Sequence, residues 1–496
     1  MNSILKCPTC GRDDQPLELS ATNPEVFSAS TPDTGMEALL NSNQLPSPST
    51  QSQLKSMHTD AANEIENLEA EIARIQSKLA LLQGRLSRRK KDVEDYATVL
   101  SPARRIPSDL LSEIFRWCTA HDFESDRSGS SLDPTEMHWI LPQVSRQWRS
   151  AALSCPQIWS TIRITDVEFG DYSAPRLLSL TLQLQRTRFS PLSVSIESKY
   201  SSISGTKPIL QVLLPSSSRW KELYVRLQPA AFRALSPLHL FLPSLKYVHI
   251  WPSGSASILD GYQAAAASHA MSTIFRVCPS LRILEGAPNI ISLFSLPWNQ
   301  IQTYECFQCA GVSQYLKLLS LMSDLRECRI WCDYGSPLNG NNDIVVLRHL
   351  KHLSLYEVGS TTNPILDCLT LPYLQTLDID LNTLEQSRIE VEINSLLRFL
   401  TRSQCSLETL HLASCWMRDI DCLRILQALP SLKTLNLVCE LSVYTSDFMD
   451  RFVELPHTLV PLLQVLKFHE VPYDAVDVSR LKEARPGLTL VQVIQD

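Results

Sequence analysis

The feature that most constrains this fold is a short apolar motif that recurs from residue 219 to the end of the chain. Each copy has a leading apolar residue, two variable residues, and two further apolar residues spaced two apart, as in LKTLNL (432–437). The leading residues are Trp220, Leu245, Leu281, Ile301, Leu325, Leu350, Leu374, Leu407, Leu432 and Leu463. Five of the nine intervals between them are 24 or 25 residues, and the others run from 20 to 36. Such a period predicts a stack of similar units over residues 219–496.

The last two apolar residues of each copy share one face of a strand, because strand side chains alternate between faces. One copy cannot bury that face alone, whereas stacked copies form a parallel sheet with a common core. Segments between copies, such as residues 393–403 and 421–430, have helical periodicity and fit the other side of the sheet. The pattern resembles leucine-rich repeats. That resemblance implies an α/β solenoid, with a parallel sheet and helices on its convex side.

Two segments before the repeats also have strand patterns. QIWSTIRI (157–164) and SPLSVSIE (190–197) alternate apolar and polar residues near their ends. We expect them to form extra strands that join the repeats to the preceding unit. Residues 164–218 are therefore expected to be a connecting region of strands and helices.

The same alternation predicts which side chains face away from the core. Trp251, Phe307, Trp331 and Tyr356 occupy equivalent outward positions in the middle copies, interrupted only by Ala287, and Arg329 faces outward beside them. Large exposed aromatic residues and arginine are enriched at binding hot spots. We therefore predict a protein substrate site at Trp251, Phe307, Arg329, Trp331 and Tyr356. The alternative is that other segments of the chain cover these rings.

A long helix is predicted over residues 54–100. Ile65, Leu68, Ile72, Ile75, Leu79, Leu82 and Leu86 are spaced alternately by three and four residues, which is the period of a coiled-coil seam. The seam continues through Arg89 to Val93, Tyr96 and Leu100. Self-association and packing on the chain's own surface both explain this pattern. Residues 1–53 are rich in Ser, Thr, Pro and Asn and are expected to be disordered.

A smaller helical unit is expected over residues 101–163. Pro107 and Ser108 mark a helix start, and Leu110, Leu111, Ile114 and Phe115 then fall on one helical stripe. A polar insert, residues 119–137, separates this stripe from a second apolar segment that contains Val144, Arg146 and Trp148. The unit closes with a Pro-x-x-Trp pattern at residues 156–159.

This ordered set of motifs resembles an F-box. The match consists of the Ile-Pro pair at 106–107, the acidic and aliphatic helix ending in Ile-Phe, the Val-x-Arg-x-Trp helix, and the terminal Pro-x-x-Trp. A coiled coil directly before the F-box is similar to the large F-box families of mushroom-forming fungi. Ser145 stands where the family often has Cys, and the insert is longer than usual.

The resemblance implies that the chain docks on a Skp-type adaptor within a cullin complex. It implies adaptor contacts through Pro107, Leu110, Leu111, Ile114, Phe115, Val144 and Trp148. The chain itself is then not an enzyme: it holds a protein substrate near a ubiquitin-conjugating enzyme. Two other functions stay open, a scaffold whose F-box-like helices do not bind the ligase and a hydrolase with an unrecognised site.

The sequence carries few signals of catalysis, cofactor binding or metal binding. It contains no Walker-type phosphate loop, no G-x-S-x-G and no H-E-x-x-H. Cys7 and Cys10 form one C-x-x-C pair without a second pair, and Cys306 of the pair Cys306–Cys309 falls at an inward strand position. We therefore expect no metal and no cofactor.

The balance of charges bears on partners and location. A net charge of −7 gives no whole-chain attraction to nucleic acid or to an anionic membrane. The chain has no apolar run of about 18 residues that would span a bilayer. We expect neither nucleic acid nor membrane as a partner, and a location in the cytoplasm, the nucleus or both.

Overall fold

The computed structural model describes residues 34–120, 129–165, 174–197, 206–227, 240–252, 273–333, 344–358, 364–383, 386–415, 419–438, 446–454, 459–469 and 475–493. It divides the chain into two compact units, Met1–Arg105 and Ile106–Asp496. Cys7, Cys10 and the first 33 residues of the expected N-terminal segment lie outside the described residues.

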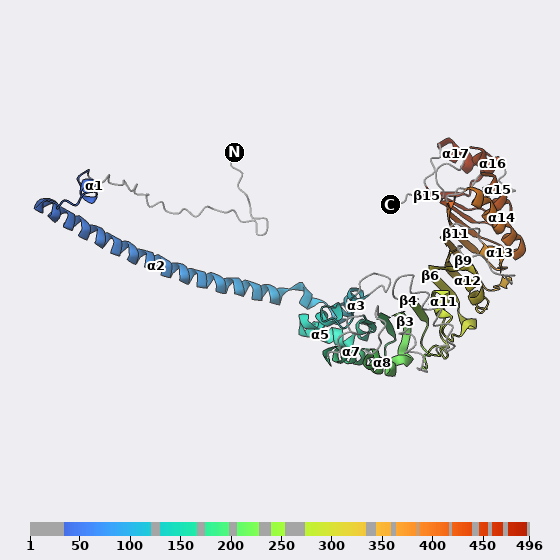
Figure 1. Ribbon diagram of the computed structural model, residues 1–496, viewed down its shortest axis with the longest axis horizontal. Helices are drawn as coiled ribbons and strands as arrows, with labels where there is room; N and C mark the ends of the chain where they lie inside the picture. The colour runs from blue at the N-terminus through green and yellow to red at the C-terminus, as the bar shows by residue number, and fades with distance from the viewer. Residues whose placement is uncertain are drawn as a thin grey trace. The chain divides into compact units, whose positions relative to one another are not determined.

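The first unit is dominated by one long helix, α2 (Pro48–Leu100), which has 53 residues (Figure 1). It follows the short helix α1 (Thr34–Leu40) and precedes a 3-10 turn, η1 (Pro102–Arg105). The helix expected over residues 54–100 is present, but it begins six residues earlier. Ser47 caps it by accepting a hydrogen bond from the backbone N–H of Thr50 at 3.2 Å, and proline is well tolerated at the first helical position.

No residue of α2 is buried. The seven seam residues from Ile65 to Leu86 are each 48–57% exposed. The apolar stripe that the sequence predicts therefore lies open to solvent along the helix.

The second unit begins with three short helices, α3 (Ser108–Thr119), α4 (Met137–Val144) and α5 (Arg146–Ser154), and a 3-10 turn, η2 (Pro156–Trp159). They enclose a small core of their own, in which Leu111, Phe115, Ala152 and Trp159 are completely buried. The Trp159 indole N–H donates to the carbonyl of Ala152 at 2.9 Å, so its polar atom is satisfied inside this core.

The rest of the second unit is built on a 13-stranded sheet in which every strand is parallel to its neighbours and the strand order follows the chain. The strands are β1 (Thr161–Ile164), β2 (Leu192–Glu197), β3 (Trp220–Leu227), β4 (Tyr247–Pro252), β5 (Ile283–Gly286), β6 (Thr303–Gly311), β7 (Glu327–Asp333), β9 (His352–Val358), β11 (Thr376–Thr383), β12 (Thr409–Cys415), β13 (Thr434–Val438), β14 (Val465–His469) and β15 (Thr489–Val493). Two further short strands, β8 (Val345–Val346) and β10 (Leu369–Thr370), pair separately.

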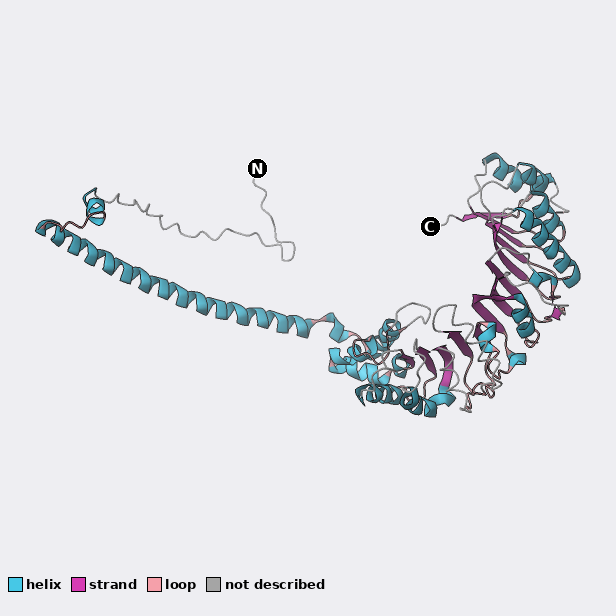
Figure 2. Ribbon diagram, in the orientation of Figure 1, coloured by secondary structure: helices cyan, strands magenta, loops and turns pink. Residues whose placement is uncertain are grey.

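Helices cover one side of the sheet and leave its other side open (Figure 2). They are α7 (Ala174–Arg186), α8 (Thr206–Leu213), α11 (Pro288–Ile291), α12 (Val312–Leu319), α13 (Pro364–Asp367), α14 (Gln386–Ser403), α15 (Asp419–Gln427), α16 (Ser446–Glu454) and α17 (Ala475–Ala484), with 3-10 turns η3 (Leu214–Arg219) and η5 (Trp298–Gln300). The sequence prediction of an α/β fold with a parallel sheet is confirmed.

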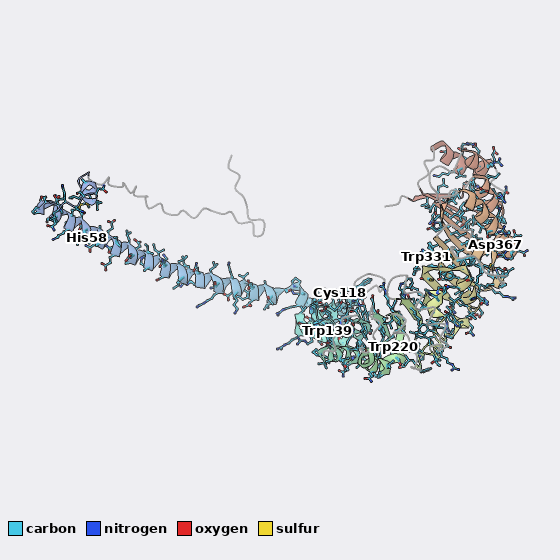
Figure 3. All side chains as sticks on the ribbon, in the orientation of Figure 1. His58, Cys118, Trp139, Trp220, Trp331 and Asp367 are labelled. Carbon is cyan, nitrogen blue, oxygen red and sulfur yellow. The ribbon has the colours of Figure 1, made fainter. Side chains whose placement is uncertain are left out.

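The apolar repeat explains the core of this sheet. All ten leading residues are buried, with exposures of 0–7%. Trp220, the first of them, begins β3, and its indole N–H donates to the Ser216 hydroxyl at 3.2 Å (Figure 3). Each repeat thus contributes one leading residue and one strand face to a core that runs through the whole stack.

The sheet extends further in both directions than the repeat pattern predicts. β1 and β2 are the two extra strands that the sequence predicts before the repeats. β2 pairs with β3 in the same parallel manner in which the later strands pair with one another. The expected division at residue 219 therefore has no counterpart in the hydrogen bonding. β15, at the other end, was not predicted, because in its register with β14 Gly487 takes the place of the leading residue Leu463 and Gln492 stands opposite Phe468.

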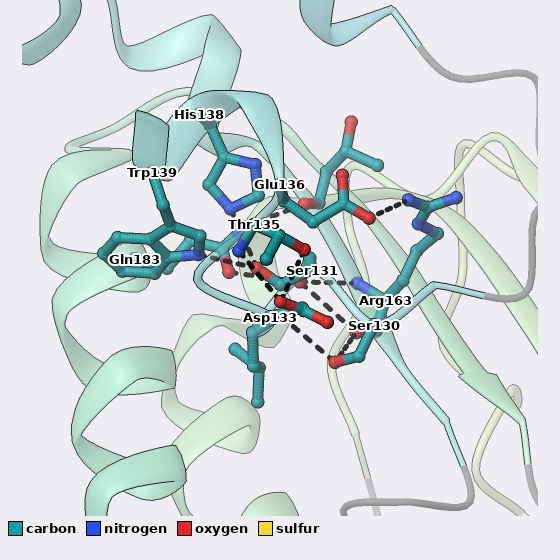
Figure 4. Close-up of polar contacts among 11 residues, drawn as sticks. Ser130, Ser131, Asp133, Thr135, Glu136, His138, Trp139, Arg163 and Gln183 are labelled. Carbon is teal, nitrogen blue, oxygen red and sulfur yellow. Dashed lines mark hydrogen bonds and ion pairs between the residues drawn. The ribbon is translucent and has the colours of Figure 1, made fainter. Parts of the chain in front are cut away.

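A buried polar junction joins the three helices to the first strand (Figure 4). It comprises Ser130, Ser131, Glu136 and His138 on the helical side, with Arg163 of β1 and Gln183 of α7. The Ser131 hydroxyl donates to Gln183 Oε1 at 3.1 Å, and the amide of Gln183 donates to the carbonyl of Thr161 at 2.8 Å. The second half of the polar insert is therefore docked against the sheet.

Charge is also buried at this junction. The Arg163 guanidinium lies 3.2 Å from Glu136 Oε1, and the two side chains are only 9% and 17% exposed. Burial lowers the pKa of Arg163, and the charge of Glu136 partly offsets this. Leu132, between the two halves of the junction, packs into the core of the sheet. The helices and the sheet consequently form one folded unit, which agrees with the division of the chain at Arg105.

Candidate functional site

The open side of the sheet carries two rows of polar and aromatic side chains. In one row, consecutive strands from β4 to β11 place His249, Glu285, Glu305, Arg329, Ser354 and Asp378 as register partners. In the second row, two residues further along each strand, Trp331, Tyr356 and Asp380 are register partners. The parallel register brings residues some 24 positions apart in sequence into direct contact.

Three of the predicted aromatic residues form a continuous aromatic row, defined here as Phe307, Trp331 and Tyr356. The rings of Trp331 and Tyr356 are stacked, with centroids 3.9 Å apart and planes at 11°. The rings of Phe307 and Trp331 lie 4.9 Å apart at 59°. Phe307 is 41% exposed and the other two rings are half-buried. The rings cover much of one another's surface, and they remain accessible from the open side.

Trp251 is joined to this row through a shared hollow. A hollow of about 440 Å³ in the open face is lined by Tyr224, Arg226, His249, Trp251, Glu285 and Phe307, among others. Trp251 stacks on His249 with ring centroids 5.6 Å apart. The four predicted aromatic residues therefore line one continuous surface, with Trp251 and Phe307 on either side of the hollow.

The interruption at Ala287 has a clear structural cause. β5 ends at Gly286, and Ala287 is buried at the start of α11. Gly286 has a φ of +151°, and a Cβ there would lie 2.5 Å from the carbonyl oxygen of Ile250. Only glycine fits this turn, which takes the chain out of the sheet one residue early. The missing ring leaves room for the hollow between Trp251 and Phe307.

Glu285 forms the polar floor of the hollow. Its carboxylate accepts hydrogen bonds from the Tyr247 hydroxyl and from His249, whose Nδ1 lies 3.0 Å from Glu285 Oε2. Burial acts to raise the pKa of Glu285, but the hydrogen bonds from His249 and Tyr247 outweigh it, so the pKa is lowered. A buried carboxylate is thus kept ionised at the base of an aromatic hollow.

The open face is acidic from β2 to β11. Along the two rows these strands carry five carboxylates, at Glu197, Glu285, Glu305, Asp378 and Asp380, and two guanidiniums, at Arg226 and Arg329. Further along the first row, β14 adds one cation, Lys467. Arg329, the predicted arginine, binds Glu305 at 3.0 Å, and Arg226 lies 3.5 Å from Glu197. Asp378 accepts the Ser354 hydroxyl at 2.9 Å. The negative charge of Asp378 lies close to the aromatic row. Together with burial, it raises the pKa of Tyr356.

A second candidate surface lies on the short helices. Leu110, Ile114 and Trp117 are 54%, 43% and 75% exposed and recur at the period of one helical stripe of α3. Met137, Ile140 and Val144 form a similar exposed stripe on α4. Exposed apolar stripes on two packed helices are typical of protein-binding surfaces. Trp117 was not among the predicted residues, although its spacing of three from Ile114 marks it as part of the stripe.

The residues expected to contact an adaptor divide into two groups. Pro107, Leu110, Ile114 and Val144 are exposed. Leu111 and Phe115 are completely buried in the small core, and Trp148 packs against Phe115 with ring centroids 5.1 Å apart. Leu111, Phe115 and Trp148 therefore hold the helices together. The side chains of an amphipathic helix point in different directions around its axis, so they cannot all face outward.

No protein-family model matches the chain, and no curated protein matches its sequence.

Ser145, the departure from the expected helix pattern, has a local structural role. It lies between α4 and α5 in an extended conformation, and its hydroxyl accepts the backbone N–H of Trp148 at 3.1 Å. Serine is a favoured cap at a helix start. Ser145 therefore sets the direction of α5, and with it the position of Trp148.

Among the described residues there is neither a metal-binding group of side chains nor a helix that could span a membrane. No group of three or more His, Cys, Asp or Glu side chains among them is placed to hold a metal ion. Cys306 is fully buried beside Tyr304, as its inward strand position predicts. None of the helices in the described ranges has the length and apolar character needed to span a bilayer.

Proposed function

We propose that this chain is the substrate-recognition adaptor of a Skp-cullin-F-box type ubiquitin ligase. In this proposal α3, α4 and α5 are the F-box, and the sheet with its helices is a leucine-rich-repeat solenoid. The observation that carries it is the exposed apolar stripe of α3, Leu110, Ile114 and Trp117, on a helix whose opposite side fills the core. An apolar surface of this kind on a folded helix favours a permanent or frequent protein partner.

The open face supports the second half of the proposal, capture of a protein substrate. Stacked aromatic rings, an arginine and a hollow with an ionised floor are the features of an interface hot spot. The excess of carboxylates on this face favours a substrate segment that carries basic residues, because complementary charge speeds and orients binding. Catalysis would belong to the conjugating enzyme, and this chain would supply proximity.

The test is binding of the full chain to a purified Skp-type adaptor. Leu110→Ala with Ile114→Ala removes part of the exposed stripe and should abolish capture while the melting temperature stays nearly unchanged. Leu178→Ala, at a 59% exposed leucine of α7, is the matched control and should bind like the wild type. Leu111→Ala is unsuitable, because its side chain is completely buried and its loss would unfold the helices.

Retained binding by the Leu110/Ile114 double variant would reject the assignment of the stripe. No binding by the wild-type chain would reject the ligase role and favour a scaffold whose F-box-like helices do not engage the ligase. The open face would then still be a protein-binding surface, since its geometry does not depend on the adaptor.

A further inference from the structure

Helix α2 presents an apolar seam that nothing in the described part of the first unit covers. Its seam residues are about half exposed along more than six helical turns, and no residue of the helix is buried. Ten such residues, each burying roughly 100 Å² against a partner, would remove about 2,000 Å² from solvent in a symmetric pair. That is the area of a stable protein interface, so a second copy of this helix is a sufficient occupant.

The charges along α2 are segregated into two long blocks, followed by a short acidic segment, Asp92, Glu94 and Asp95. Residues 60–71 carry five carboxylates, at Asp60, Glu64, Glu66, Glu69 and Glu71, and no basic residue. Residues 72–91 carry seven basic residues, at Arg74, Lys78, Arg85, Arg88, Arg89, Lys90 and Lys91, and no carboxylate. Two parallel copies in register would place like blocks side by side, whereas two antiparallel copies place each acidic block against a basic one.

The positions that flank the seam favour the same orientation. Glu64, Glu71 and Arg85 each precede a seam residue, while Glu69 and Lys90 each follow one. In a parallel pair, a residue that precedes a seam position on one helix lies next to a residue that follows a seam position on the other helix. Glu64 then approaches Glu69, and Arg85 approaches Lys90. In an antiparallel pair, two residues that both precede a seam position lie next to each other, and so do two residues that both follow one. Glu71 then approaches Arg85, and Glu69 approaches Lys90.

The seam itself fits an antiparallel overlap. With the crossing point midway between Ile75 and Leu79, Ile72 lies level with Leu82 and Leu68 lies level with Leu86. The overlap then extends from Leu54 to Leu100, and only residues 48–53 of each helix extend beyond it. Two like-charge approaches remain: Lys78 approaches its own copy, and Glu64 approaches Asp92 of the short acidic segment.

We infer that α2 pairs with α2 of a second copy of this chain in an antiparallel coiled coil. The chains then leave the pair at opposite ends, about 70 Å apart at 1.5 Å per residue of overlap. Each end carries one copy of the unit that follows. This inference is independent of the proposed ligase function.

The decisive experiment is zero-length cross-linking of carboxylates to lysines in an equimolar mixture of ¹⁴N- and ¹⁵N-labelled full chain. A mixed-isotope link between Lys90 and Glu69 is expected, and it cannot form within one helix, where these residues lie roughly 30 Å apart. A mixed-isotope link between Lys90 and Asp92 would show a parallel pair and overturn the inference. A chain that sediments as a monomer at all concentrations would overturn it as well.

Charge reversal gives a second, independent test by sedimentation. Arg85→Glu with Lys90→Glu should weaken self-association at least tenfold, because both residues then face carboxylates. Adding Glu69→Lys and Glu71→Lys to the same chain should restore it. Reversal without effect, or without rescue, would contradict the antiparallel arrangement. Circular dichroism of each variant checks that the helix is retained, and adaptor binding should be unchanged throughout.

Discussion

Both units of the chain have a repeating pattern of apolar residues, but the pattern is buried in one unit and exposed in the other. In the sheet, the ten leading residues of the repeats are 0–7% exposed. In α2, the seven seam residues from Ile65 to Leu86 are 48–57% exposed. Periodicity identifies the side chains whose burial is favourable, but it does not say which surface covers them.

The difference follows from how each element meets its neighbours. In the sheet, the next repeat follows within about 20 to 36 residues of the chain. Its strand pairs with the preceding one, so the apolar face of each strand is covered within the same molecule. A helix of 53 residues has no element of similar length elsewhere in the described chain. In the pairing inferred above, a second copy of the chain covers this seam, and the predictions below separate the two situations.

The largest effect is expected for a leading residue of the repeat. Leu350→Ala removes a side chain that is 0% exposed and should lower the free energy of unfolding of the second unit by about 2–5 kcal/mol. Urea denaturation followed by circular dichroism measures it. Leu321→Ala, at a leucine that is 49% exposed, is the matched control and should cost less than about 1 kcal/mol. Equal losses would remove the distinction between the two classes of leucine.

A second contrast concerns charged pairs. Glu136→Gln leaves Arg163 buried without its counter-ion and should destabilise the second unit by about 2 kcal/mol. Glu113→Gln is the control on α3, where Glu113 and Arg116 are 2.9 Å apart and both about half exposed, and should be nearly silent. Thermal melts of both variants at moderate salt make the comparison. An unchanged Glu136→Gln protein would show that the polar junction contributes little to stability.

The third prediction tests the seam of α2. Leu79→Ala should weaken self-association by roughly 1.5 kcal/mol and leave the unfolding of the second unit unchanged, because the residue is buried only in the pair. Sedimentation equilibrium gives the association constant. Leu81→Ala, at a leucine of the same helix that is 55% exposed and lies off the seam, is the control. A loss of stability in the second unit on Leu79→Ala would indicate instead that α2 packs on its own chain.

The smallest effect on stability is expected in the aromatic row. Trp331→Ala should cost about 1 kcal/mol, the value of an aromatic stack, because the ring is half-buried against Tyr356 and Phe307 and no core cavity is opened. Binding of a substrate should weaken by about 2 kcal/mol or more. A loss of 3–5 kcal/mol of stability would mean that the ring is covered, and the open face would then not be the binding surface.

Much of the fold was accessible from the sequence because its determinants are local and repeated. The helix over residues 54–100 and the ten repeat strands follow from spacing alone, and β1 and β2 follow from alternation. The polar junction was not accessible in this way. Ser131 meets Arg163 and Gln183 across 32 and 52 residues, and no pattern in the sequence marks such pairs.

The candidate sites were accessible only in part, for two different physical reasons. Helical periodicity selects a stripe that is wider than the buried side, so Leu110 and Leu111 look alike in sequence although one is exposed and the other is not. Strand alternation placed Trp331 and Tyr356 on one face correctly. It did not predict their stacking or the hollow beside Gly286, because ring orientation and the early end of β5 depend on tertiary packing.

The polar junction also determines how the sheet ends. A parallel sheet with bare outer strands is a template on which another chain can add a strand and begin to polymerise. At β1 the backbone N–H of Ser131 donates to the carbonyl of Arg163 at 3.0 Å, and the backbone N–H of Arg163 donates to the Ser131 hydroxyl at 3.0 Å. A foreign strand cannot pair with the middle of β1 without first displacing Ser131, so this edge is protected against edge-to-edge aggregation.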